Sequence, residues 1–595
     1  MMSDEKIKIV SSNIQGKASL IWNLANSLHG AYKPHEYGLV ILPMVIIKRF
    51  HDCLLPTIDK VLKKYEEIEI KGFGVKDLFL RQASGYSFYN TSGFTFERLK
   101  ADPENIKANF EAYIQGFSEN VTDILDKMNF SPQIERMSDA RLLYQVICDF
   151  TSDKANMSPE KISTVDMGYI FENLIQRFSE SYNEEAGAHF TSRDIIYLMC
   201  DMLTINADFT KLDGAVKTVY DMAMGTSQML TCMEERVHAL DANAEILCFG
   251  QEINPSTFGI AKVDMLIRGG NPQNMRFGDT LSDDKFPTDR FDYCISNPPF
   301  GIDWKREAMQ VEAEHKQGSK GRFGPGLPAK SDGQMLFLLN GISKLKNNGR
   351  MAIIQNGSSL FTGDAGSGPS EIRRYIIEND WLDAIVQLPN DSFYNTGIAT
   401  YVWLITKNKP QEHRGYVQLI DASRCFEPRR KSIGNKRVDI SEHCRNLIIK
   451  AYGEYTDRNY EEVLENGKSK IICKSKVLKS ESFGYRKIIV ESPKLDENGA
   501  VVMQKGMPMA DASKRDTENV ALDEDIDKYF KREVLPYKPD AWIDKSKTKI
   551  GYEIPFTRTF YEYKKLELAE DIEKRIRERE KSLMQKLQKL FAGDE

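Results

Sequence analysis

The sequence has no long apolar run. Its longest, residues 39–47, contains Pro43 and is far shorter than the roughly 20 residues that a membrane span needs. The first ten residues, MMSDEKIKIV, also lack the apolar core of a secretory signal. We therefore expect a cytoplasmic protein with no membrane partner.

Cysteine and histidine are scarce. The 9 cysteines and 8 histidines are scattered, with no C-x-x-C pair and no cluster at zinc spacing, so the sequence predicts unpaired thiols and no metal site. The net charge of −6 excludes a chain that is basic throughout. Any contact with nucleic acid would need a local basic patch or a partner.

The spacing of apolar residues changes along the sequence. Residues 1–165 repeat apolar side chains at helical spacing, which predicts an N-terminal helical domain. Residues 166–420 alternate short apolar segments with helical ones, which predicts an α/β domain with a parallel, doubly wound, Rossmann-like sheet. The segments expected to be strands are 216–221, 245–250, 291–296, 350–355, 382–388 and 401–407, and 226–240 is expected to be a helix.

The C-terminal part is rich in charge and contains one helical pattern at its end. Residues 421–560 are charged and irregular, and we expect a connecting region with a hairpin or loop at 494–509. Residues 561–595 contain a narrow apolar stripe at helical spacing between charges. This C-terminal helix could pack on its own domain, or it could protrude and dock on a partner.

Two of the expected strands end in residues suited to a nucleoside-like ligand. The first is followed by DMAMGTSQ (221–228), where a glycine turn leads into a helix whose free N–H groups face the ligand. The second ends at Glu252, an acidic residue placed to accept ribose hydroxyls. Asp279, in FGDTL, is placed to receive an adenine amino group.

The strand 291–296 runs directly into Asn297, Pro298, Pro299 and Phe300. Proline has no N–H and a fixed φ, so this loop is rigid and cannot continue the ladder. The amide oxygen of Asn297 and the carbonyl of Pro298 can accept hydrogen bonds from one exocyclic amino group, which prepares its nitrogen to attack a methyl group. Phe300 offers a face for stacking a base, and a base in a duplex must be flipped out to reach it.

This order of motifs resembles the N6-adenine DNA methyltransferases that use S-adenosylmethionine. Further stretches resemble the modification subunit of type I restriction–modification systems, over about 450 residues or more. They are MGYIFENLIQRFSE (167–180), AGAHFTSRDIIYLM (186–199), FGQEINPSTFGIAKVDMLI (249–267), GRFGPGLP (321–328), FYNTGIATYVWLITKNK (393–409) and GYEIPFTRTFY (551–561).

The resemblance implies a cofactor site, catalytic residues and partners. The segment AHFTSR matches a family stretch that helps hold the methionine end of S-adenosylmethionine. The implied partners are double-stranded DNA, a DNA specificity subunit, a second copy of the chain and a restriction subunit. The implied cofactor-binding residues are Ala188, His189, Phe190, Thr191, Ser192, Arg193, Asp221, Gly225, Thr226, Ser227, Gln228, Glu252 and Asp279, and the implied catalytic residues are Asn297, Pro298, Pro299 and Phe300.

The chain departs from the family pattern D-P-x-x-G-T-G-G in its first turn. Met222, Ser227 and Gln228 replace a proline and two glycines, and their side chains could narrow the cofactor pocket. This leaves open a weakly active or inactive subunit that clamps DNA and assembles the complex. A methyltransferase acting on a protein glutamine or on RNA is a third hypothesis. The loop 315–326, rich in glycine and lysine, could contact DNA phosphates or be an exposed flexible loop.

Overall fold

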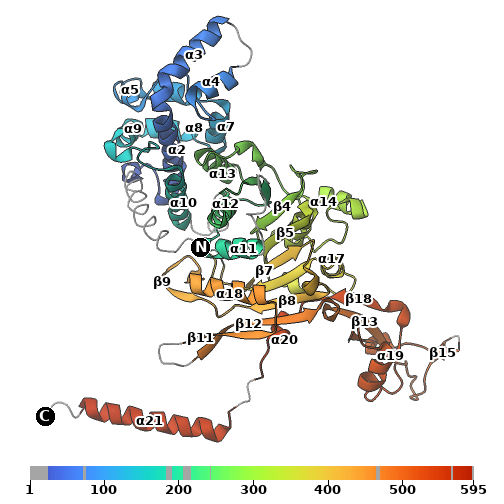
Figure 1. Ribbon diagram of the computed structural model, residues 1–595. Helices are drawn as coiled ribbons and strands as arrows, with labels where there is room; N and C mark the ends of the chain where they lie inside the picture. Colours follow the sequence, from blue (N-terminus) through green and yellow to red (C-terminus); the bar gives the residue numbers. More distant parts are fainter. Residues whose placement is uncertain are drawn as a thin grey trace. The chain divides into compact units, whose positions relative to one another are not determined.

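The computed structural model describes residues 25–71, 76–181, 191–205, 216–241, 243–394, 396–463, 469–504, 506–563 and 567–591 (Figure 1). The chain divides into two compact units, Met1–Ile554 and Pro555–Glu595. Among the described residues no helix is both long and apolar enough to cross a membrane.

The described part of the predicted N-terminal domain is helical, as expected. The apolar run 39–47 forms the centre of α2, and nearly every residue of that helix is buried. Its neighbours pack around it through one shared core, to which α10 (Thr164–Ser181) and one side of α13 (Pro255–Ile267) also contribute. The helices of this region are α2 Gly38–Leu54, α3 Ile58–Lys71, α4 Asp77–Ser84, α5 Phe96–Lys100, α6 Ile106–Gln115, α7 Glu119–Lys127, α8 Ser131–Asp139 and α9 Leu143–Thr151.

The second region is built on a ten-stranded sheet in the order β11-β12-β8-β6-β7-β5-β4-β1-β2-β3. All six strands predicted from apolar runs are present. Strands β3, β2, β1, β4 and β5 run parallel. The strands are β1 Lys217–Asp221, β2 Ile246–Glu252, β3 Met275–Phe277, β4 Phe291–Ser296, β5 Leu345–Asn356, β6 Leu382–Gln387, β7 Thr400–Thr406 and β8 Tyr416–Asp421.

Helices cover the sheet on two sides (Figure 1). Helix α11 (Arg193–Thr204), α12 (Gln228–Leu240) and α13 share a core with alternate residues of the strands, Val219 among them. The side chain of the next residue, Tyr220, points to the other face of the sheet and stacks on Phe291. Helix α15 (Gln334–Lys344) contacts β4 and β5, and α17 (Gly368–Glu378) contacts α15. The doubly wound α/β fold predicted from the sequence is confirmed.

Within residues 166–420, the expectation of a parallel sheet is wrong at one strand. Strand β7 lies between β5 and β6 and is antiparallel to both. The described residues between β6 and β7 form no helix. Because no crossover helix carries the chain back to the other end of the sheet, β7 returns directly beside β6, and a direct return gives an antiparallel pair.

Residues 421–560 are more than a connection. Strand β12 (Ser469–Lys479) pairs with β8, β11 (Arg458–Val463) extends the sheet further, and α18 (Glu442–Glu454) packs on its core. A second sheet follows, with a small core of its own. The expected hairpin is present as β14–β15. The remaining strands are β9 Glu427–Ile433, β10 Lys436–Asp439, β13 Gly484–Glu491, β14 Met503–Gln504, β15 Met507–Pro508, β16 Asp516–Ala521, β17 Trp542–Ile543 and β18 Lys549–Tyr552.

A fully buried arginine joins this second sheet to the main domain. Arg373 of α17 donates hydrogen bonds to the carbonyls of Ser359 (3.0 Å), Thr362 (2.9 Å) and Tyr552 (2.6 Å), and burial lowers its pKa to about 10. The variant Arg373→Met would leave buried carbonyls unpaired, which costs about 1–3 kcal/mol for each group.

We therefore expect Arg373→Met to lower the free energy of unfolding by about 3 kcal/mol, measured by urea denaturation of the full chain. The neighbouring Arg374→Met removes only ion pairs of a half-buried side chain with Glu371 and Glu378 and should change stability by less than about 1 kcal/mol. Equal urea midpoints for the two variants would contradict this assignment.

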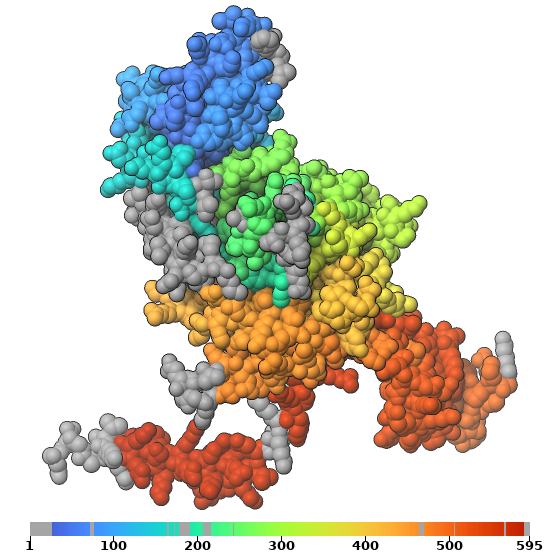
Figure 2. Space-filling view, in the orientation of Figure 1, coloured from blue at the N-terminus to red at the C-terminus, as the bar shows by residue number. Residues whose placement is uncertain are grey.

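The second unit contains α20 (Phe556–Thr559) and α21 (Ala569–Phe591), the helix predicted at 568–591. Residues 569–587 of α21 are all exposed within this unit (Figure 2). Its apolar stripe includes Ile572, Ile576, Leu583 and Leu587, which are 40–61% exposed. The helix therefore does not bury this stripe against its own unit.

Candidate active site

The carboxyl ends of β1, β2 and β4 meet at one cavity of about 230 Å³. This is the end at which open α/β sheets bind ligands, because the parallel strands deliver their last residues to the same edge. Nine of the residues predicted from the sequence line it: Thr191, Asp221, Gly225, Thr226, Gln228, Glu252, Asp279, Asn297 and Pro299.

The other predicted residues lie elsewhere. Ala188, His189 and Phe190 are outside the described residues. The side chains of Ser192, Arg193, Ser227, Pro298 and Phe300 do not line the cavity. Phe300 is half-buried and packs against the core of the sheet.

The first turn has a serine, Ser227, where the family pattern has its second glycine. Gly225 and Ser227 both have positive φ, 53° and 67°, a backbone conformation that favours glycine. The Ser227 side chain is fully buried and donates to Oδ2 of Asp264 on α13, 3.3 Å away. It therefore does not narrow the cavity. Met224 and Gln228 line the cavity, which stays open between them.

Glu252 joins the first turn to the end of β2. One carboxylate oxygen accepts the N–H of Gly225 (3.0 Å) and the other accepts the N–H of Asn254 (2.7 Å). The side chain is 6% exposed. Each carboxylate oxygen can accept a further hydrogen bond, so Glu252 is held in place at the cavity wall with acceptor capacity left for a ligand.

Asp221, the last residue of β1, is an unusual carboxyl group. It is buried at the cavity, and its Oδ1 accepts hydrogen bonds from the hydroxyl of Ser296 (2.7 Å) and the N–H of Ala223 (3.1 Å). Burial raises its pKa to about 7, and the charge of Glu252 adds to the rise. Near neutral pH the protonated and ionised forms of Asp221 therefore coexist.

Asn297 carries an unused acceptor. Its side-chain nitrogen donates to Oγ1 of Thr191, 2.9 Å away, while its Oδ1 is buried without a hydrogen-bond partner among the described residues. An unpaired buried polar atom costs about 1–3 kcal/mol. Thr191 thus orients the amide, and the lining position of Asn297 makes its oxygen an acceptor for a ligand donor.

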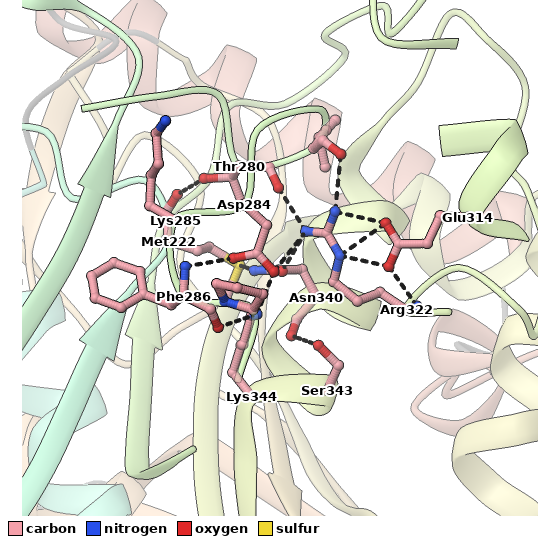
Figure 3. Close-up of polar contacts among 12 residues, drawn as sticks. Met222, Thr280, Asp284, Lys285, Phe286, Glu314, Arg322, Asn340, Ser343 and Lys344 are labelled. Atoms are coloured by element: carbon pink, nitrogen blue, oxygen red, sulfur yellow. Dashed lines mark hydrogen bonds and ion pairs between the residues drawn. The ribbon is translucent and has the colours of Figure 1, made fainter. Parts of the chain in front are cut away.

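Arg322 hydrogen-bonds the backbone of the two residues that follow Asp279 (Figure 3). The Arg322 guanidinium donates to the carbonyls of Thr280 (2.7 Å) and Leu281 (3.0 Å) and pairs with Glu314 through two nitrogens, both at 2.8 Å. It also donates to Oδ1 of Asn340 (2.9 Å). One side chain therefore joins the loop 315–326, for which a DNA contact and an exposed flexible loop were both open, to a wall of the cavity. This part of the loop has a structural role.

Arg193 was predicted to bind the cofactor, but it faces away from the cavity. Its guanidinium donates to Glu235 (2.8 Å) and to the Tyr197 hydroxyl (2.7 Å). Burial raises the pKa of Glu235, but the charges of Arg193 and Arg268 hold it below its ordinary value. Arg193 thus joins α11 to α12 by an ion pair.

Some residues that line the cavity were not predicted from the sequence. Ile302 and Asp303 directly follow the loop of Asn297, and their position alone could have indicated them. Phe337 comes from the buried helix α15, where nothing in an apolar helical pattern separates a core residue from a lining one. Met222, Met224 and Met229 add further apolar side chains to the wall, as do Ile253 and Leu281.

Comparison with known proteins identifies the chain. A model of the N-6 DNA methylase family matches residues 163–482, and a model described as the HsdM N-terminal domain matches residues 17–150. The first match covers more than half of the chain, so the chain belongs to the N-6 DNA methylase family.

Its relatives make the class more specific. The chain is similar to the type I restriction enzyme MjaIX methylase subunit of Methanocaldococcus jannaschii, with 22% identity over 77% of this chain and 81% of the relative. The HindI methylase subunit of Haemophilus influenzae is 27% identical over 46% of this chain and 58% of the relative. A methyltransferase subunit of a type I restriction-modification system from Streptococcus thermophilus shares the fold, with a TM-score of 0.59, 21% identity and coverage of 79% and 97%.

The chain is thus a methylase subunit of the type I restriction–modification class and an adenine-specific DNA methyltransferase, as the resemblance predicted.

Proposed function

We propose that the cavity at the ends of β1, β2 and β4 binds S-adenosylmethionine beside a flipped adenine of DNA. The residues present fit this cofactor: Glu252 offers acceptors for ribose hydroxyls, Asp279 offers an acceptor for an adenine amino group, and the turn at Gly225 lets the backbone approach. When bound, S-adenosylmethionine supplies an electrophilic sulfonium methyl group.

The observation that carries the proposal is the unused oxygen of Asn297. The amide is oriented by Thr191, and its Oδ1 accepts a hydrogen bond from the N6 amino group of adenine. With the Pro298 carbonyl as a second acceptor, the nitrogen lone pair is freed for attack, and the two prolines keep the acceptors in place. Phe300 follows directly, and the exposed part of its half-buried ring would stack on the flipped base from outside the cofactor cavity.

The partners proposed for the chain are DNA, a DNA specificity subunit, a second copy of the chain and a restriction subunit. The exposed stripe of α21 supports a role for this helix in docking on another subunit, since a narrow apolar stripe between charges suits helix–helix packing. The proposal is tested by assembling the chain with a co-encoded specificity subunit and assaying DNA for N6-methyladenine. A complex that binds DNA and cofactor without forming this product would contradict it.

The pKa of Asp221 predicts how cofactor binding depends on pH. A cationic cofactor beside Asp221 favours the carboxylate, so the proton held below about pH 7 must leave on binding. Affinity for S-adenosylmethionine should therefore rise about tenfold between pH 6 and pH 8 and then level off. Calorimetry across this range should show the rise in the wild-type chain and a flat profile in Asp221→Asn. If the affinity of the wild-type chain did not change with pH, Asp221 would not lose a proton when the cofactor binds.

A further inference from the structure

A second cavity, of about 680 Å³, lies beside the end of α15 and under the loop 318–325. Its walls come from the segment before β4, from this loop, from α15 and α17, and from Lys407 just after β7. None of its lining residues lines the cofactor cavity. Nothing in the methyl-transfer chemistry described above uses it.

The charges on its walls are unbalanced. Five cationic side chains line it, and only two carboxylates do. The cations are Arg290, Lys320, Arg322, Lys344 and Lys407, and the carboxylates are Asp284 and Glu314.

Both carboxylates are already engaged (Figure 3). Glu314 pairs with Arg322 through two hydrogen bonds of 2.8 Å. Asp284 pairs with the ammonium of Lys344, which is 2% exposed, and lies 3.8 Å from Arg322. These pairs neutralise Arg322 and Lys344 and leave Arg290, Lys320 and Lys407 unbalanced.

None of these three cations has an ion-pair partner among the carboxylates of the described residues. Arg290 donates to the carbonyls of Pro287 (3.4 Å) and Asp289 (2.7 Å). The Lys407 ammonium donates to the carbonyl of Leu345 (3.3 Å) and lies 5.2 Å from the Trp381 ring centroid. Burial and the charge of Arg290 lower the pKa of Lys407.

We propose that this cavity binds a phosphate group. Arg290 and Lys407 carry like charges, and neither pairs with a carboxylate of the described residues. An anion between them would relieve their repulsion and pair with both. The hydroxyls of Ser319 and Ser343 line the same cavity and can donate to phosphate oxygens. The phosphate belongs either to the DNA backbone or to a free polyphosphate compound, and the chemistry of recognition is the same for both.

The test uses the full chain and the variant Arg290→Gln/Lys407→Gln. The matched control is Lys60→Gln/Lys71→Gln, which removes the same charge from exposed positions on α3. Calorimetry with inorganic pyrophosphate should show an affinity at least about tenfold weaker for the cavity variant alone. If the phosphate belongs to the DNA backbone, the slope of log K against log salt for duplex DNA should also fall by about two in the cavity variant.

The outcomes separate the two sources of phosphate. Weaker pyrophosphate binding with a reduced salt slope supports the DNA backbone, and weaker pyrophosphate binding with an unchanged slope supports a free phosphate compound. Wild-type binding of both probes by the cavity variant would overturn the proposal. Lys320→Gln, which alters an exposed loop residue, should weaken pyrophosphate binding without risk to the fold. Unchanged cofactor binding by each variant confirms folding and keeps this result independent of the proposed methyl transfer.

Discussion

Replacing Asn297 with alanine is expected to lower kcat for methyl transfer to DNA by about 100- to 1,000-fold, the usual cost of removing one group that stabilises a transition state. The substitution deletes the buried Oδ1 that has no partner in the described chain and leaves Glu252 and the first turn untouched. The affinity for S-adenosylmethionine should therefore stay close to that of the wild type. Single-turnover methylation and calorimetry on the assembled complex measure the two quantities separately.

Two further variants sharpen this test. Thr191→Val removes only the acceptor that orients the Asn297 amide, so it should lower kcat by about tenfold, the value of one hydrogen bond. Asn379→Ala, at an exposed position after α17, should leave kcat unchanged. A wild-type kcat for Asn297→Ala would remove Asn297 from the reaction.

Changing Glu252 to glutamine should weaken S-adenosylmethionine binding by about 10- to 150-fold, which is the value of a hydrogen bond to a charged group. Two backbone N–H groups, of Gly225 and Asn254, point at the two carboxylate oxygens. A glutamine must present its own NH₂ group to one of them, so two donors face each other. The substitution therefore removes a ribose acceptor and disturbs the turn together.

The matched control for this change is Glu245→Gln, an exposed residue just before the same strand. It should bind S-adenosylmethionine as the wild type does, by calorimetry. If Glu252→Gln bound with wild-type affinity, the ribose would have to be held elsewhere.

Much of the fold could be predicted because burial leaves a readable pattern. The strands of the main sheet that lie between helices are buried on both faces, so they appear as mostly apolar segments such as 291–296. Strands β11, β12 and β16 instead mix exposed charged residues with few apolar ones. A strand at or near an edge buries too little to show such a run, which is why 421–560 looked like a connection.

The site residues whose position follows from the backbone could be predicted from the sequence. Those whose side chain can contact either the cavity or a neighbouring helix could not. Glu252 and Asn297 follow from their places at strand ends. The directions of Arg193 and Ser227 do not, because each could reach either the cavity or an adjacent helix. Glu235 and Asp264 decide the outcome, and both lie tens of residues away in the sequence. Their acceptor oxygens are visible only once the helices are packed.

The bonds of Arg322 have a mechanical consequence. A single guanidinium group donates hydrogen bonds to the carbonyls of Thr280 and Leu281 and to the carboxylate of Glu314. Displacing the segment 314–322 would therefore break these bonds or move the residues that follow Asp279. We therefore expect this segment and the residues that follow Asp279 to move as one rigid piece.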